Sequence, residues 1–534
     1  MALRLHNTLT KKLEEFTPLS DKRVTLYTCG PTVYDYPHVG NWAANIYWDI
    51  LVRTLIVNGY KVERVMNITD VGHLVSDADD GEDKLEKGAR REGKTAWEIA
   101  EFYAEDFLAG MEKLGLIPPE HVTKATDFID QQLDLVRTLK EKGYTYQTTD
   151  GIYFDTAKFP TYADFAGLDL KAQRAGARVE ANDEKRQAWD FALWKFTPAG
   201  QKRDMEWETP DDLLELPRFE NSEPGASFDS DSAFPAEARQ DRKVDQLASS
   251  RSEKKDGIGR TSKNEEPIMG FPGWHLECSA MAMDILGSTI DIHTGGIDHI
   301  PVHHTNEIAQ SEAASGQQFS RFWLHCNHLK IEGGKISKSL GNGYTLQDIE
   351  KRGFSPMDLR LFVLQSDFMS EGNFTWENLE AAKNRLHNWR GYAALRHQIH
   401  DRLTDDTVKD DSDEYLAFYE PTSALKVALS DNLSTPRALQ IIDEAFARLD
   451  SVALDTVHRA SFYDFIQMID ELLGLQLEVS SPDISDDNKR LILERMRARE
   501  VADWHRSDQI RDTLAKDGIA VRDTSHGTVW SYLG

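Results

Sequence analysis

Apolar and β-branched residues at the start of the chain alternate between a strand pattern and a helical period. Residues 24–28 are predicted to form a buried strand and residues 42–57 a helix. Residues 61–68 follow as a second strand, which completes a strand–helix–strand unit of a parallel sheet. Ligands of such sheets bind beyond the carboxyl ends of the strands. The pattern therefore predicts an α/β domain with a site near Cys29 and Thr69.

Helical periods return later in the chain and dominate its second half. Between the first strand–helix–strand unit and the helical second half, the pattern predicts a strand at 288–294, a helix at 301–314 and a strand at 322–331. Residues 151–155 are expected to form a short strand. Helices are predicted at 97–114, 128–142, 356–366, 376–400, 415–429, 436–450, 459–474, 489–501 and 504–516. The later helices indicate a helical bundle, and the chain closes on a small α/β tail.

Residues 211–267 differ in composition from the rest of the chain. They contain 14 Asp/Glu and 9 Lys/Arg, many serines, and neither Trp nor Tyr. Such a segment buries too little apolar surface to offset the entropy of ordering, so we predict that it is disordered. The expected domains are a nucleotide-binding catalytic domain (1–110 and 268–355), an inserted subdomain (111–210), the polar insertion (211–267), a helical bundle (356–480) and a small C-terminal domain (481–534).

Overall composition limits the class of protein. A chain of 534 residues with 40% hydrophobic residues and 12 tryptophans is long enough for several packed domains. No apolar run reaches the roughly 18 residues of a membrane span, and three cysteines cannot form a disulfide framework, which indicates a cytoplasmic protein. The net charge of −28 opposes nucleic-acid binding overall, but a local basic groove can coexist with it.

Two separate segments have the chemistry of a phosphate site. His38-Val-Gly-Asn41 stands at a predicted helix start, where free N–H groups and the helix dipole attract phosphate. Far downstream, Lys335 and Lys338 lie in a loop of small polar residues. Together they predict a site that holds the triphosphate of ATP from both sides, although the lysine loop alone would read as a solvated basic turn.

The motifs taken together resemble the cysteinyl-tRNA synthetases, a family of class I aminoacyl-tRNA synthetases. No single motif is decisive, but their order along the chain is specific. The resemblance implies a Rossmann-like parallel-sheet catalytic domain with an inserted subdomain, an anticodon-binding helical bundle and a small C-terminal α/β tail. The matching segments are 7–9, 29–41, 67–70, 273–281, 291–293, 303–311, 335–339, 373–377, 435–439 and 497–508.

The resemblance also implies a zinc site made by Cys29, Cys278, His303 and Glu307. His303 and Glu307 are four residues apart, so on a helix they share one face. Two thiolates, an imidazole and a carboxylate are an acceptable tetrahedral set for Zn²⁺. Without the resemblance, two buried cysteines and an ordinary helical pair would explain the same residues. Cys326 is expected to pack in the core.

The resemblance implies further binding residues. L-Cysteine and ATP are the expected substrates, Mg²⁺ accompanies ATP, and tRNA(Cys) is the expected partner of a monomeric enzyme. His38, Asn41, Lys335 and Lys338 are the expected catalytic residues. Gly30, Thr69, Trp274 and His293 are assigned to the cysteine pocket, Gly295, Gly296 and Asp298 to ATP, and Arg499, Asp508, Asp523 and Trp530 to the anticodon.

Two alternatives remain open at this stage. One is a ligase that joins cysteine to a small amino-sugar, which would share the catalytic domain but lack the anticodon-binding end. The other is a non-catalytic RNA-binding paralogue, for which retention of both phosphate-binding motifs has no physical reason. Cysteine-dependent pyrophosphate exchange, with and without tRNA, separates the three.

Overall fold

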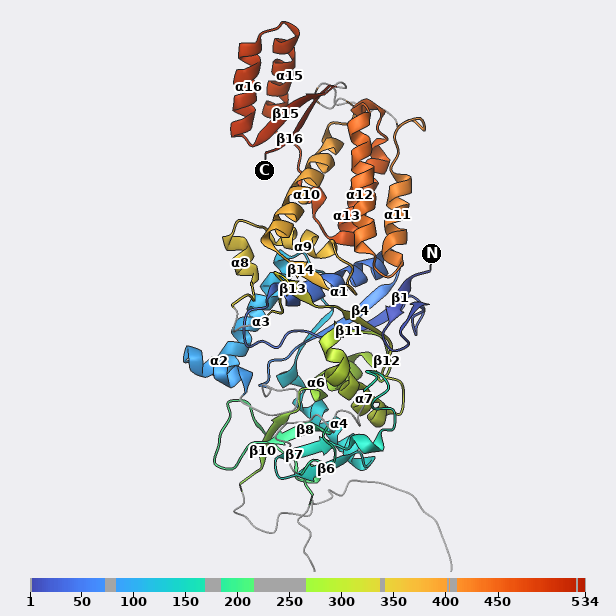
Figure 1. Cartoon of the computed structure of the whole chain (residues 1–534), viewed down its shortest axis with the longest axis vertical. Coiled ribbons are helices and arrows are strands. Elements are labelled where there is room, and N and C mark those ends of the chain that lie inside the picture. The colour runs from blue at the N-terminus through green and yellow to red at the C-terminus, as the bar shows by residue number, and fades with distance from the viewer. Residues whose placement is uncertain are drawn as a thin grey trace, which may run out of the picture.

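The computed structural model is elongated, with a parallel sheet in its middle (Figure 1). An inserted antiparallel sheet lies at one end, and a helical bundle followed by a small C-terminal unit extends to the other. The structure describes residues 2–72, 83–168, 184–215, 266–336, 341–400, 403, 411–524 and 527–533.

The central sheet has five parallel strands in the order β12-β11-β3-β4-β5. The strand order reverses at β3, because β4 and β5 follow on one side and β11 and β12 on the other. The carboxyl ends of β3 and β11 therefore form the switch point where ligands of such sheets bind. The strands are β3 (Arg23–Thr28), β4 (Lys61–Ile68), β5 (His121–Lys124), β11 (Ile290–Gly296) and β12 (Ser320–Cys326).

The helix predicted after the first strand is confirmed as α1 (Val39–Val57) and begins three residues earlier than expected. It is buried over most of its length between the sheet and the bundle. On one side it packs against α3 (Ala96–Lys113), where the rings of Trp42 and Phe107 stack with centroids 5.1 Å apart. This double-sided burial explains why the helix is apolar all round rather than on one stripe.

Three predictions need correction. The parallel sheet does not end at residue 110, because β5 lies in the range expected for the inserted subdomain and pairs with β4. The strand predicted at 322–331 is two strands, since the chain turns at Asn327 and β13 (Leu329–Ile331) pairs with β14 (Gly372–Phe374) in another sheet. The helix predicted at 301–314 is a π-helical turn, Ile300–His304, that runs into α7 (Thr305–Ser315).

The inserted sheet is antiparallel, in the order β6-β7-β8-β10-β9, with one face packed on α4 (Ile129–Glu141). β9 and β10 pair with each other on either side of the polar insertion, with Glu208 opposite Met269. The predicted disorder of residues 211–267 falls, for 216–265, outside the described residues. The strands are β6 (Thr145–Thr148), β7 (Gly151–Phe154), β8 (Phe191–Phe196), β9 (Trp207–Glu208) and β10 (Met269–Pro272).

A buried polar junction joins the predicted helical bundle to the central domain. Arg360 of α9, fully buried, pairs with Asp49 of α1 and donates to the carbonyls of Leu114 and Leu473. Because Leu473 ends a bundle helix, this junction ties the bundle to α1. The helices are α9 (Pro356–Leu364), α10 (Trp376–Ala394), α11 (Tyr419–Ser430), α12 (Thr435–Ala447) and α13 (Arg459–Leu473).

The C-terminal unit is an α-hairpin followed by a β-hairpin, held to the bundle by Trp530. The backbone of Trp530 exchanges two hydrogen bonds with the side chain of Gln398, and its ring is buried. The elements of this unit are α15 (Asp486–Glu500), α16 (Trp504–Lys516), β15 (Ile519–Thr524) and β16 (Gly527–Tyr532).

Shorter elements complete the chain. They are β1 (Arg4–Asn7), β2 (Lys12–Glu15), α2 (Lys84–Glu92), α6 (Leu276–Leu286), α8 (Leu346–Lys351) and α14 (Leu477–Ser480). None of the helices in the described residues has both the length and the apolarity needed to cross a bilayer.

Candidate active site and metal centre

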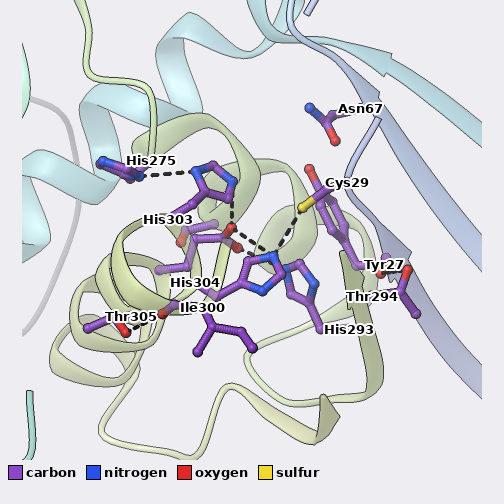
Figure 2. A network of polar contacts seen from close by, with 12 residues as sticks. Tyr27, Cys29, Asn67, His275, His293, Thr294, Ile300, His303, His304 and Thr305 are labelled. Atoms are coloured by element: carbon purple, nitrogen blue, oxygen red, sulfur yellow. Dashed lines mark hydrogen bonds and ion pairs between the residues drawn. The ribbon is translucent and has the colours of Figure 1, made fainter. Parts of the chain in front are cut away.

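Cys29 is the first residue after β3 and stands at the switch point of the sheet. Its backbone N–H donates to the carbonyl of Thr294 on β11, which fixes it between the two strands. The next residue, Gly30, donates its N–H to Oδ1 of Asn67 at 2.8 Å. A Cβ at Gly30 would lie 1.7 Å from the carbonyl oxygen of Asn67. Only glycine therefore fits this turn, and it holds Cys29 close to the end of β4 (Figure 2).

Four residues expected to bind zinc converge on this point. Cys278 lies in the first turn of α6, His303 in the π-helical turn and Glu307 in the first turn of α7. The ligand atoms of Cys29, Cys278, His303 and Glu307 all lie within 4.8 Å of one another. Two donors about 2.0–2.3 Å from one zinc ion are at most about 4.6 Å apart. The spacing is therefore close to that of a single-ion site.

The electrostatics of this group fit a cation. Burial raises the pKa of the Cys29 and Cys278 thiols. Burial favours neutral His303, yet the charge of Glu307 raises its pKa overall. Burial also opposes ionisation of Glu307, but the charges of His293 and His303 lower its pKa. A divalent ion would reverse the thiol shifts, because a coordinating thiol is deprotonated.

One carboxylate oxygen of Glu307 is available for such an ion. Oε2 accepts from Nε2 of His293 at 2.9 Å. Oε1 forms an ion pair with Nε2 of His303 at 2.8 Å, so two of the four donors already lie side by side. A bound ion would replace this contact. The donor set fits zinc.

Sequence reasoning missed His304, which belongs to a second, overlapping group with Cys29, His293 and Glu307. Nε2 of His304 lies 3.3 Å from Sγ of Cys29 (Figure 2). Its Nδ1 lies 2.7 Å from Nε2 of His325. Both of its ring nitrogens therefore have neighbours in the protein. The adjacent pair His303-His304 was the available sequence signal, but a helical period cannot show that both rings turn inward.

The residues expected in the cysteine pocket surround the metal centre. Gly30 adjoins Cys29, and His293 contacts Glu307. The Trp274 ring lies over His303 with centroids 4.6 Å apart. Thr69, at the end of β4, donates to Oε1 of Glu277 at 2.6 Å. Cys326 is buried and belongs to neither metal-binding group, in keeping with the expected core role.

The phosphate-binding motif begins α1. Nδ1 of His38 accepts the N–H groups of Gly40 and Asn41 at 3.1 and 3.2 Å. Since Nδ1 accepts, the proton of the neutral ring sits on Nε2, which is then a donor. Oδ1 of Asn41 accepts the N–H of His38 in return, which leaves the amide Nδ2 of Asn41 as its donor.

The lysine loop meets this helix start. A Cβ at Gly40 would lie 2.9 Å from Cδ1 of Ile336, next to Lys335 in the chain. Beyond the loop, the carbonyl of Tyr344 accepts the N–H of Val39. The two motifs that sequence analysis paired are thus in contact. Lys338, assigned the main catalytic role, lies outside the described residues.

The glycines expected near adenosine end β11. A Cβ at Gly295 would lie 2.5 Å from the His304 ring, and one at Gly296 would lie 2.3 Å from Oδ1 of Asp298. Gly295 therefore requires a bare backbone, because the His304 ring is buried, whereas the Asp298 side chain next to Gly296 is exposed and could turn away. Asp298 itself is exposed in the short helical turn after β11.

The anticodon residues proposed from the sequence are only partly accessible. The side chain of Asp508 is 60% exposed, and that of Arg499 is 37% exposed over the Trp504 ring. Asp523 is bound to Arg495 through both carboxylate oxygens.

Two tryptophans in this unit differ in exposure. Trp530 is 1% exposed, so its ring packs in the core and cannot stack on a base, which corrects the expected role. Trp504, which sequence reasoning did not assign, is 56% exposed.

Comparison with known proteins is consistent with this geometry. The family model described as "tRNA synthetases class I (C) catalytic domain" matches residues 15–212 and 236–384. A solved structure of Mycobacterium tuberculosis methionyl-tRNA synthetase with methionyl-adenylate has a TM-score of 0.54 at 13% identity, and the match covers 86% of this chain and 93% of that one. The fold and the site thus define a class I aminoacyl-tRNA synthetase.

Full-length relatives narrow the class. A "Cysteinyl-tRNA ligase anticodon binding domain" model matches residues 481–530. Cysteine–tRNA ligase of Treponema denticola is 36% identical over 100% of both chains, and cysteine–tRNA ligase 1 of Burkholderia lata is 38% identical over 99% of this chain and 96% of its own. The chain belongs to the cysteinyl-tRNA synthetase family, and the match to an anticodon-binding domain excludes the amino-sugar ligase, which would lack that end.

Proposed function

We propose that this chain activates L-cysteine with ATP to form cysteinyl-adenylate and then transfers the cysteinyl group to tRNA(Cys) in the cytoplasm. The observation that carries the proposal is the convergence of Cys29, Cys278, His303 and Glu307 at the switch point of the sheet, the same edge from which α1 begins. Family membership supports the reaction, and the geometry supports the residues that perform it.

Zinc is the metal that this set of residues would hold. Cys29, Cys278, His303 and Glu307 offer two thiolates, one imidazole and one carboxylate oxygen, a set typical of Zn²⁺. When bound, zinc supplies a preference for a thiolate over a neutral hydroxyl. A pocket that only measures size separates two such similar side chains by about 1–3 kcal/mol. Metal recognition therefore explains selection of cysteine over serine without an editing site.

The remaining pocket residues orient the amino acid. The ring of Trp274 borders the metal centre beside His303, and Gly30 holds Cys29 in place through its hydrogen bond to Asn67. Thr69 presents its hydroxyl from the end of β4. With the thiol at the metal centre, the carboxylate of cysteine would be directed toward the start of α1, where it would attack the α-phosphorus of ATP.

The start of α1 and the lysine loop would hold the phosphates. Nε2–H of His38 and Nδ2–H of Asn41 are donors at a helix N-terminus, where the dipole favours anions. Lys335 and Lys338 would balance the charge on the β- and γ-phosphates, with Mg²⁺ accompanying ATP. Gly295, Gly296 and Asp298 would lie against adenosine. These residues act by positioning and charge stabilisation.

The C-terminal unit would read the anticodon. Arg499 and Asp508 are accessible and offer hydrogen bonds to base edges, and the exposed ring of Trp504 beside Arg499 offers a stacking surface. Asp523 would act mainly by holding Arg495 and Arg499 in place.

Cysteine-dependent ATP–pyrophosphate exchange tests the proposal. Wild-type protein should exchange with cysteine and not with serine, and Lys338→Ala should lower the exchange rate by orders of magnitude, as expected when a preorganised positive charge is lost from the transition state. Lys330→Ala, on the strand before the loop and paired with Glu371, is the matched control. Exchange with serine at a rate near that with cysteine would contradict metal recognition of the thiol.

A further inference from the structure

An aromatic cluster, made of Tyr36, Phe102 and Tyr103, lies beside the start of α1 and is used by neither the metal centre nor the phosphate site. The ring of Tyr36 lies edge-to-face with those of Tyr103 and Phe102, with centroids 5.0 and 6.1 Å apart. Tyr103 is buried, but Tyr36 is 38% and Phe102 is 40% exposed. A single exposed aromatic ring is ordinary on a protein surface. Here the two exposed rings of Tyr36 and Phe102 are in contact, and Tyr36 stands two residues before His38, so together they form a continuous apolar surface.

Basic residues border this cluster. Residues 84–94, which include α2, contain five Lys/Arg and two Glu, a net charge of +3 in a chain whose net charge is −28. The side chains of Arg90 and Arg91 are 60% and 59% exposed. Nζ of Lys94 lies 4.8 Å from the centroid of the Phe102 ring. The apolar surface thus lies directly against a local positive region.

Three carboxylates lie near Tyr36, since burial and the charges of Asp106, Glu92 and Asp35 raise its pKa, and Glu92 among them is paired with cations. Glu92 pairs with Arg91 at 3.0 Å and with Lys94 at 3.5 Å, and it accepts from the hydroxyl of Tyr103 at 3.1 Å. It therefore fixes the cluster in position rather than repelling an anion. The packing of α2 against this loop is close, since a Cβ at Gly88 would contact the carbonyl of Tyr34 at 3.7 Å.

Exposed aromatic rings flanked by cations are the chemistry that binds single-stranded nucleic acid, because every base has a π-face and every nucleotide a phosphate. The acceptor in the proposed reaction is the unpaired 3′ end of a tRNA, which must reach the carboxyl ends of β3 and β11. We propose that the aromatic cluster binds this single-stranded 3′ end, with a base stacked on Tyr36 or Phe102 and with the basic residues of α2 at the phosphates. The inference rests on the proposed function.

The placement of α2 fits this role. In Figure 1, α2 projects from the flank of the molecule between the bundle and the inserted sheet, and α16 lies toward the same side of the view. An RNA held by the C-terminal unit could therefore follow this flank to the aromatic cluster. The cluster would guide the strand, while the metal centre and α1 act on cysteine and ATP.

Replacement of Phe102 by alanine tests the proposal. We expect Phe102→Ala to raise KM for tRNA in aminoacylation by about 5- to 150-fold, the range for loss of one stacked base. Cysteine-dependent ATP–pyrophosphate exchange does not require tRNA and should stay within about twofold. Tyr36→Phe keeps the ring and should leave KM near the wild-type value, whereas Tyr36→Ala should raise it. Trp97→Ala removes an equally exposed ring elsewhere on α3 and is the control for surface truncation.

A truncated RNA locates the contact. The affinity of wild-type protein for intact tRNA should exceed that for tRNA without its unpaired 3′ nucleotides, and Phe102→Ala should reduce this difference. An unchanged KM, an equal loss with both RNAs, or a parallel fall in exchange would each overturn the proposal. Failure of the wild-type protein to catalyse any exchange would instead overturn the proposed function.

Discussion

His38 and Asn41 cap α1 reciprocally: Nδ1 of His38 accepts the N–H of Asn41, and Oδ1 of Asn41 accepts the N–H of His38. The same imidazole is the proposed phosphate donor through Nε2–H. His38→Asn should keep a capping side chain and the stability of α1, but it withdraws the ring donor. We expect a fall in exchange kcat of about 10²- to 10³-fold with little change in the melting temperature.

His38→Ala is the companion variant, because it removes the cap as well as the donor. Its unfolding free energy should fall by about 1 kcal/mol relative to His38→Asn. Equal exchange rates in wild type and His38→Asn would show that the ring is only a cap.

The metal centre predicts the metal content of the purified protein. Elemental analysis should find about one zinc ion per wild-type chain, as a single four-residue site implies. Cys278→Ser substitutes a neutral hydroxyl for a thiolate and should lose most of the metal together with cysteine-dependent exchange. Cys326→Ser, which changes a buried thiol outside both metal-binding groups, should keep the metal.

A His293 variant tests whether this residue orients the metal ligand Glu307 or contacts the cysteine substrate directly. Its Nε2 donor holds Oε2 of Glu307, so His293→Ala should weaken zinc binding by about 10- to 100-fold. The measurement is competition with a chelator of known affinity, followed in the absence of substrates. A raised KM for cysteine with unchanged zinc affinity would assign this residue to the pocket instead.

The buried pair of Arg360 and Asp49 predicts the stability of the junction between bundle and sheet. Arg360→Ala leaves Asp49 with Arg53 as its remaining arginine partner and takes a donor from the carbonyls of Leu114 and Leu473, so it should lower the free energy of unfolding by about 3 kcal/mol. Arg385→Ala removes a more exposed pair with Asp443 and should cost less than about 1 kcal/mol. Denaturant unfolding of the three proteins checks the comparison, and equal losses would contradict it.

Asp523 predicts the acid stability of the C-terminal unit. Hydrogen bonding to Arg495 lowers its pKa to about 2 from the model-compound value of 3.8. A lowered pKa stabilises the folded state above the unfolded value, and this stabilisation is lost as pH falls from 3.8 toward 2. Asp523→Asn should therefore be less stable than wild type at pH 6, and the gap should narrow by pH 3. If the difference in stability between wild type and Asp523→Asn did not change with pH, the ion pair between Asp523 and Arg495 would be excluded as its cause.

Local sequence patterns predicted the elements that recur at short range. Residues 61–68 and 504–516 form a strand and a helix with the predicted bounds, because each carries its own period and its own ends. Of the inserted sheet, only the strand at 151–155 was predicted, and it is confirmed as β7. The sheet as a whole was not predicted, since β8 and β10 pair across more than seventy residues and neither is periodic enough alone.

The solvent exposure of a side chain also cannot be predicted from a single sequence. Trp504 is exposed and Trp530 is buried, because burial of Trp530 depends on contact with Gln398 of the bundle, which lies far away in the sequence. The zinc residues were assigned only through family resemblance. No local pattern could join Cys29 to Cys278, which the fold brings together by returning β11 beside β3.

The pairing of β9 with β10 means that the chain leaves the inserted sheet and re-enters it at adjacent backbone positions. The pairing of β9 with β10 holds the two ends of the intervening segment next to each other. The length of that segment can therefore change without strain on Cys29, Cys278 or α1. A shorter linker or a foreign domain could accordingly replace residues 216–265 between β9 and β10 with retention of aminoacylation activity.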